Sequence, residues 1–112
     1  PASERWDVTV PVRPDEAILS LPTFSKWGTE LAELTRDYPH LVVAGVATDC
    51  CVLSTVLGAV DAGKYVTVVS DACGGATPQA HDQALELMKM LSPMVSVLDS
   101  EAFLSSSTTV AP

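Results

Sequence analysis

Positive charge is scarce in this sequence of 112 residues. It has 6 Lys and Arg against 14 Asp and Glu, which gives a formal net charge of −8, and it has no basic cluster. Such a chain repels phosphate backbones, so we expect no nucleic-acid partner. Long apolar runs are also missing, because no stretch approaches the roughly 20 residues that cross a bilayer. We therefore predict no membrane-spanning segment.

Cysteine and histidine are too few and too irregularly spaced for a disulfide framework or a metal centre. The three cysteines are the adjacent Cys50 and Cys51 and the distant Cys73, and His40 and His81 each stand alone. Neighbouring cysteines rarely bridge each other, so reduced thiols and a cytoplasmic location are expected. The first ten residues also lack the pattern of a secretion signal. We predict neither a metal nor a cofactor.

Apolar residues make up 47% of the chain, and their spacing alternates between strand and helix patterns. Strands are predicted over residues 17–21, 41–45, 65–70 and 94–98, and helices over residues 29–38, 50–60 and 78–91. Thr29 is expected to cap the first helix, and Thr77, followed by a proline, the third. In the second helix, Leu53, Val56, Leu57 and Val60 form the expected apolar stripe.

Strands that alternate with helices in this way predict βαβ units and therefore an α/β fold. We expect a parallel sheet with helices on both faces, a Rossmann-like three-layer sandwich. The run LVVAG (residues 41–45) does not alternate, which is typical of a strand covered on both faces. Residues 1–104 are predicted to form one domain, and the Ser/Thr-rich residues 105–112 a disordered tail.

The cysteine pair lies where chemistry is expected in such a fold. Ligands of open parallel sheets bind outside the carboxyl ends of the strands, and Cys50 and Cys51 follow the strand predicted over residues 41–45. The first turn of a helix favours a thiolate, and its N–H groups can face an oxyanion. About 100° separates neighbouring helical residues, so at most one thiol faces the cleft. A small buried core cysteine is the alternative reading.

The segment GVATDCCVLSTVLGAVDAGKYVTVVSDACGGATPQAHDQAL resembles the signature of the isochorismatase-like cysteine hydrolases, which include nicotinamidases and N-carbamoylsarcosine amidase. The upstream FSKWGTEL is similar to a second stretch of that family, so the resemblance covers about residues 21–98. It implies that Cys51 is the nucleophile, whereas Cys50 falls on a variable position and serves packing. It also implies a cis peptide bond between Val46 and Ala47, which aims the Ala47 N–H, with that of Cys51, into an oxyanion hole.

Further roles follow from the same resemblance. Trp27 falls where the family often has an aromatic side chain that lines the pocket, with a buried core tryptophan as the equal alternative. Val46 and Thr48 are expected to contact substrate. His81 matches a helix position that is common in the family, and a structural role is expected for it.

The chain departs from the family pattern at two catalytic positions. The family uses a triad of Asp, Lys and Cys, but the Asp motif is absent here and Leu21 stands where the Lys is expected. Lys26 is a nearby candidate to replace that Lys. The first strand and helix of the fold and the region that supplies metal ligands in nicotinamidases are also missing. We therefore expect the chain to be one part of a longer polypeptide, with completion by a partner subunit as an alternative.

Two functions remain open from the sequence. The first is a cysteine hydrolase that cleaves a C–N bond of a small amide or ureido compound through a covalent thioester. The second is a non-catalytic binding or assembly protein of the same fold, because the Lys and the Asp segment are absent. A vinyl ether hydrolase is disfavoured by the presence of Cys51. The resemblance also implies a homo-oligomer, a dimer or a tetramer.

Overall fold

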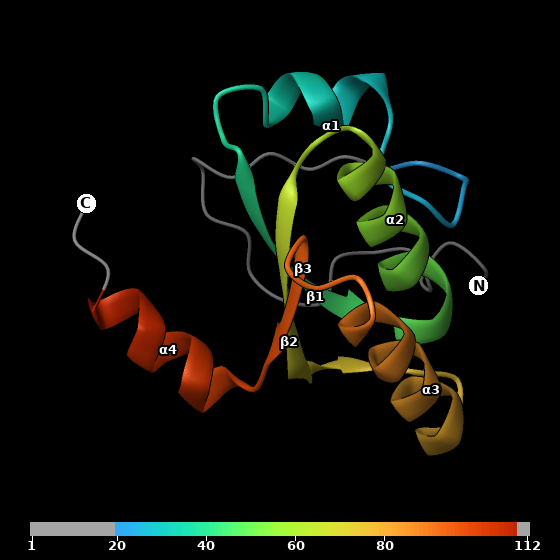
Figure 1. Ribbon diagram of the computed structural model, residues 1–112. Coiled ribbons are helices and arrows are strands. Elements are labelled where there is room, and N and C mark those ends of the chain that lie inside the picture. Colours follow the sequence, from blue (N-terminus) through green and yellow to red (C-terminus); the bar gives the residue numbers. More distant parts are fainter. Residues whose placement is uncertain (1–19, 110–112) are drawn as a thin grey trace.

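The computed structural model describes residues 20–109 as a parallel sheet with helices packed around it (Figure 1). Strands β1 (His40–Val46), β2 (Tyr65–Gly74) and β3 (Val95–Leu98) lie in the order β1-β2-β3, and both neighbouring pairs are parallel. The helical elements are α1 (Thr29–Leu34), the π-helical turn η2 (Thr48–Val52), α2 (Leu53–Asp61), α3 (Pro78–Lys89) and α4 (Ser100–Thr109). The predicted α/β fold is confirmed.

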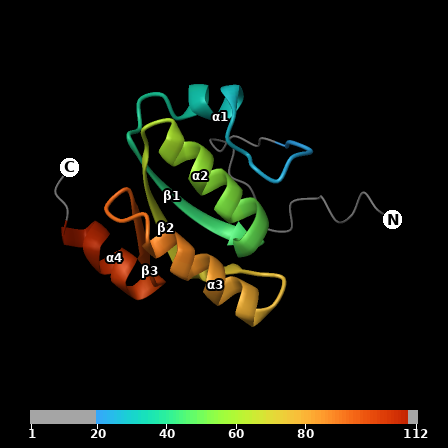
Figure 2. The ribbon, with the colours of Figure 1, turned by 45° about the vertical axis from the view of Figure 1, so that its right-hand side comes forward.

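The helices form layers on the two sides of this sheet. Figures 1 and 2 show α2 and α3 side by side along one face, while α4 lies on the other side, where it contacts β2 and β3. The strand predicted over residues 17–21 falls mostly outside the described residues, and Ser20 and Leu21 are not in a strand. Residues 1–19 and 110–112 lie outside the described part.

The core lies between the sheet and the pair α2 and α3. Its buried side chains come from η2, α2, β2, α3 and β3: Val52, Val56, Ala59, Val66, Val68, Ala84, Leu85, Met88 and Val95, while Leu41 and Val43 of β1 are partly buried against them. Val56, Val68 and Met88 are fully buried. Ala84, Leu85 and Met88 are the buried residues of α3. The predicted cap of this helix is confirmed, because the Thr77 hydroxyl accepts a hydrogen bond from the Ala80 N–H at 3.0 Å.

The inner stripe of α2 matches the predicted one at Val56, which is buried, and at Leu53 and Val60, which pack against the core, but not at Leu57. Leu57 is 41% exposed, whereas Val52 and Ala59 are buried beside Val56. Where apolar residues are this frequent, two adjacent faces of a helix can both carry them at positions i, i+4 and i+7. The face that packs on the sheet carries Val52, the last residue of η2, just before α2 begins.

The prediction that β1 is covered on both faces is wrong within the described residues. Burial alternates along it, so Leu41, Val43 and Gly45 face the helices while Val42 and Val46 are exposed. The cause is topological, because β1 is the terminal strand in the order β1-β2-β3 and the main contacts of α4 with the sheet are to β2 and β3. An apolar run therefore does not by itself distinguish a strand covered twice from one covered once.

Smaller differences concern element ends. Helix α1 ends at Leu34, four residues before the predicted end at residue 38. Gly28, and not Thr29, is the N-cap of α1, which buries no residue. Strand β2 continues to Gly74, but its pairing with β1 is interrupted after Val68 and resumes at Cys73. Helix α4 reaches Thr109, so part of the expected tail is helical. The side chain of Asp99 starts this helix by accepting a hydrogen bond from the Ala102 N–H at 2.7 Å.

Candidate functional site

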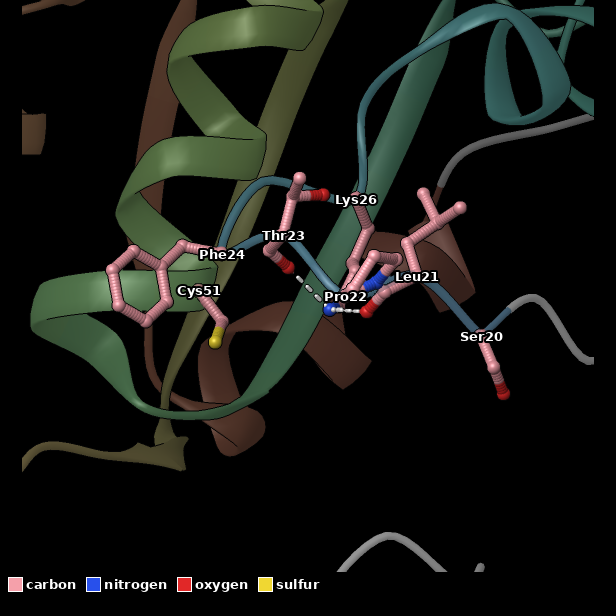
Figure 3. Close-up of a pocket in the computed structure, with 7 residues that line it drawn as sticks. All are labelled: Ser20, Leu21, Pro22, Thr23, Phe24, Lys26 and Cys51. Carbon is pink, nitrogen blue, oxygen red and sulfur yellow. Dashed lines mark hydrogen bonds between the residues drawn. The ribbon is translucent and has the colours of Figure 1, made fainter.

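A cavity of about 620 Å³ opens between η2 and the segment that precedes α1. Cys51 is the one residue of η2 that lines it (Figure 3). The other lining residues share the segment at positions 20–26 and are Ser20, Leu21, Pro22, Thr23, Phe24 and Lys26. The walls are mainly apolar, and Lys26 is the charged side chain among them. The cavity can therefore hold a small organic molecule beside a sulfur atom.

The backbone that presents Cys51 is the π-helical turn η2. Ala47 precedes the turn in an extended conformation, and its carbonyl accepts hydrogen bonds from the N–H groups of Cys50 at 3.1 Å and Val52 at 3.0 Å. Turns of this kind occur often at functional sites. The helix continues directly into α2, so the Cys51 side chain, which is half-buried, projects from the first turn after β1.

The wall opposite Cys51 is tied to α2 by hydrogen bonds. The Lys26 N–H donates to the Thr55 hydroxyl at 2.8 Å, and Ser25 Oγ donates to the Ser54 carbonyl at 3.3 Å. The Lys26 ammonium group donates to the carbonyls of Leu21, at 2.7 Å, and Thr23. These contacts hold the Lys26 side chain along the same segment that faces Cys51 (Figure 3).

Two predicted substrate contacts lie away from this cavity. Trp27 packs against the core, so close to α2 that a Cβ atom on Gly58 would lie 2.8 Å from the Trp27 Cβ. The alternative of a core tryptophan fits this position. Val46 is 75% exposed at the end of β1, and neither residue lines the cavity.

Thr48 and His81 form a contact that lies beneath the turn. Thr48 is fully buried, and its hydroxyl lies 2.7 Å from Nδ1 of His81 on α3. The neighbouring Asp49 carboxylate accepts a hydrogen bond from the Ala76 N–H at 3.1 Å. Because its side chain is enclosed, Thr48 cannot touch a molecule in the cavity, and the expected substrate contact is not supported by its position. The structural role expected for His81 agrees with this contact.

The other two cysteines face different surroundings. Cys50 is half-buried, with its Sγ 4.0 Å from a carboxylate oxygen of Asp49. Cys73 lies on β2, where burial raises the pKa of its thiol, while a hydrogen bond from the Gly45 backbone opposes that shift. Neither lines the cavity. Of the three thiols, Cys51 is thus the one placed beside the space for a ligand.

The predicted cis peptide bond between Val46 and Ala47 is present. Within residues 20–109 no cluster of three or more His, Cys, Asp or Glu side chains could hold a metal ion. None of the helices in the same residues combines the length and apolar character needed to cross a bilayer.

Reasoning from the sequence missed most of the cavity wall. The sequence points to Leu21 and Lys26 in connection with the missing lysine, but no motif marks Pro22, Thr23 and Phe24 as site residues. One signal could have found them, because this segment follows a predicted strand and should reach the carboxyl edge of the sheet. Phe24, 68% exposed and beside the cavity, is the kind of aromatic residue expected of a binding surface.

Comparisons with known proteins agree with this arrangement. The isochorismatase domain model matches residues 2–102. The nicotinamidase of Escherichia coli is 42% identical over 64 residues, which are 55% of this chain and 30% of that protein. A secreted isochorismatase effector of Phytophthora sojae is 31% identical over 94 residues, 80% of this chain and 45% of that protein.

Solved structures give the same picture. A Leishmania major protein proposed to be a MAR1 ribonuclease matches with a TM-score of 0.85 and 26% identity, over 91% of this chain and 53% of that one. This chain therefore spans about half of that structure and less than half of the two curated relatives.

Proposed function

Since the chain belongs to the isochorismatase family, we propose that it carries the nucleophile of a hydrolase that cleaves a C–N bond of a small amide or ureido compound. The observation that carries the proposal is the position of Cys51, which lines a cavity of about 620 Å³ from the first helical turn after β1. A nicotinamidase among the relatives supports an amide as the substrate class.

The reaction begins with attack of the Cys51 thiolate on the carbonyl carbon, which forms a C–S bond and places a negative charge on the carbonyl oxygen. The N–H groups of Ala47 and Cys51 stabilise that oxyanion. The C–N bond then breaks, and the nitrogen takes a proton and leaves as ammonia or an amine. Water attacks the resulting thioester, releases the carboxylic acid and regenerates the thiolate.

The leaving nitrogen needs a proton, and Lys26 is the candidate donor in this cavity. Its ammonium group is bonded to two backbone carbonyls, which orient it along the wall that faces Cys51. The water that attacks the thioester returns the proton to Lys26. Leu21, which lines the same wall, cannot carry a proton.

An activated ester tests the nucleophile separately from the proton donor. A p-nitrophenyl ester of a small acid acylates a competent thiolate without protonation of its leaving group, so the experiment does not depend on Lys26 or on a base outside this chain. Peptide mapping after a short exposure should place the acyl group on Cys51. Cys50→Ala should leave acylation intact, and Cys51→Ala should abolish it.

The non-catalytic alternative is tested by the same measurement. The apolar Leu21 in the cavity wall favours it, because a site without the triad lysine can still bind a small molecule. Slow acylation spread evenly over Cys50, Cys51 and Cys73 would contradict the hydrolase and support a binding protein.

A further inference from the structure

The two residues that open η2 are both held by α3 and the connection that leads to it. The Thr48 hydroxyl lies 2.7 Å from Nδ1 of His81, and Asp49 Oδ1 accepts a hydrogen bond from the Ala76 N–H at 3.1 Å. Thr48 is fully buried, so water does not replace its partner. A buried hydroxyl without a hydrogen-bond partner is costly, which makes this contact specific.

The fit around these contacts is close. A Cβ atom added to Gly75 would lie 2.9 Å from the Cβ and backbone nitrogen of His81 and 3.0 Å from Asp49 Oδ1. Such distances leave no room for a side chain. At Gly75, the connection between β2 and α3 therefore passes directly between His81 and the Asp49 carboxylate.

The position of this first turn determines where the sulfur of Cys51 lies. Thr48 and Cys51 belong to the same π-helical turn, in which the Ala47 carbonyl bonds the N–H groups of Cys50 and Val52. Movement of Thr48 would shift the backbone N–H of Cys51 and its sulfur relative to the end of β1. Acyl transfer is sensitive to shifts below about 1 Å, because nucleophile and oxyanion donors must be aligned together.

We propose that His81 is a positioning residue, which acts through Thr48 to hold Cys51 and the neighbouring N–H groups in the geometry needed for acyl transfer. The inference rests on the proposed function, because it assumes that Cys51 is the nucleophile. His81 itself does not line the cavity, so it acts without touching the substrate.

Two reagents separate positioning from a general loss of structure. Acylation of Cys51 by a p-nitrophenyl ester needs the oxyanion donors, whereas alkylation by iodoacetamide needs only an accessible thiolate. In His81→Ala we expect acylation to fall about tenfold while alkylation of Cys51 changes less than about twofold. His81→Asn can place an amide near Thr48 and should restore acylation to within about threefold of the parent chain.

The partner hydroxyl gives a matched pair. Thr48→Val keeps the shape of the side chain and should reduce acylation as His81→Ala does, whereas Thr48→Ser should keep it. The double variant Thr48→Val/His81→Ala should be acylated no more slowly than the slower single variant, because both substitutions remove the same hydrogen bond.

The outcomes separate this inference from the proposed function. If the parent chain is not acylated at Cys51, the proposed function fails. If the parent is acylated, the positioning role is wrong in two cases. In the first, His81→Ala slows acylation and alkylation by the same factor, and in the second it slows neither reaction. Faster alkylation of all three cysteines in His81→Ala would show that His81 serves only to stabilise the fold, which would also contradict the positioning role. In that case His81→Asn would be acylated no faster than His81→Ala.

Discussion

The hydroxyl of Thr48 lies 2.7 Å from Nδ1 of His81, so the turn that carries Cys51 is fastened to a helix that starts 30 residues further along the chain. The position of Cys51, the proposed nucleophile, therefore depends on both the sheet and α3. The sheet supplies the point where β1 ends, and α3 fixes the turn that follows.

Replacement of Lys26 by Met should separate the two halves of the proposed reaction. Cleavage of an anilide needs a proton on the leaving nitrogen, and loss of general acid catalysis typically costs about 10² to 10⁴ in rate. Acylation by a p-nitrophenyl ester needs no such proton and should change less than about threefold. Stopped-flow release of the aniline and of the nitrophenolate, in a polypeptide that turns over the anilide, measures both. Equal turnover of the anilide in Lys26→Met and the parent would exclude Lys26 as the donor.

Gly75→Ala should destabilise the fold by about 1–3 kcal/mol, because overpacking of this size is costly where backbone stands in the way. The added Cβ meets the backbone nitrogen of His81 at 2.9 Å, which cannot turn aside. Gly74→Ala is the control, since a Cβ there would meet only a side-chain carbon of Val46, at the ordinary contact distance of 3.4 Å. Urea unfolding followed by circular dichroism compares the two variants, and equal midpoints would show that the contact around His81 is not tight.

Two methionines of the same region test the position of the core. Met88 is fully buried, whereas Met90, just after α3, is 79% exposed. Met88→Ala should lower the free energy of unfolding by about 2–5 kcal/mol through the cavity it leaves. Met90→Ala should change it by less than about 0.5 kcal/mol. Denaturant titration of both variants measures the difference, and a comparable loss in each would contradict the packing of α3 on the sheet.

Asp71 links β2 to the start of α4 in a pH-dependent way. Hydrogen bonds from the Ser100 hydroxyl and N–H, both at 2.7 Å, hold the pKa of Asp71 below its ordinary value. A carboxyl with a lowered pKa stabilises the fold above its unfolded pKa, near 3.9, and that stability is lost as the pH falls through the folded pKa. Ser100→Ala should therefore raise the Asp71 titration midpoint toward about 3.9, as measured by NMR. An unaltered midpoint in Ser100→Ala would show that this contact does not set the titration.

Local patterns in the sequence predict the fold well. The order of strands and helices follows from apolar spacing, and Thr77 with Pro78 marks the start of α3 because capping acts over a single turn. The face of α2 that is buried could not be chosen, since Val52 and Leu57 are both apolar and only the sheet distinguishes them. Local chemistry thus predicts elements better than their orientation.

The candidate site divides in the same way. The motif around Cys51 predicts a nucleophile at the end of a strand, and the cavity beside it agrees with that prediction. The opposite wall depends on contacts between distant residues, such as the hydrogen bond from the Lys26 N–H to Thr55, 29 positions away. The burial of Thr48 depends equally on His81, 33 positions away. No spacing within a short motif could reveal either contact.

The most direct test of Cys51 as the nucleophile is the order in which the three cysteines react with iodoacetamide at about pH 7. Cys73 serves as the internal reference, because burial raises the pKa of its thiol and should keep it unreactive at that pH. Peptide mapping should find Cys51 alkylated well before Cys50 and Cys73. Equally slow alkylation of Cys51, Cys50 and Cys73 would contradict the assignment of Cys51 as the nucleophile.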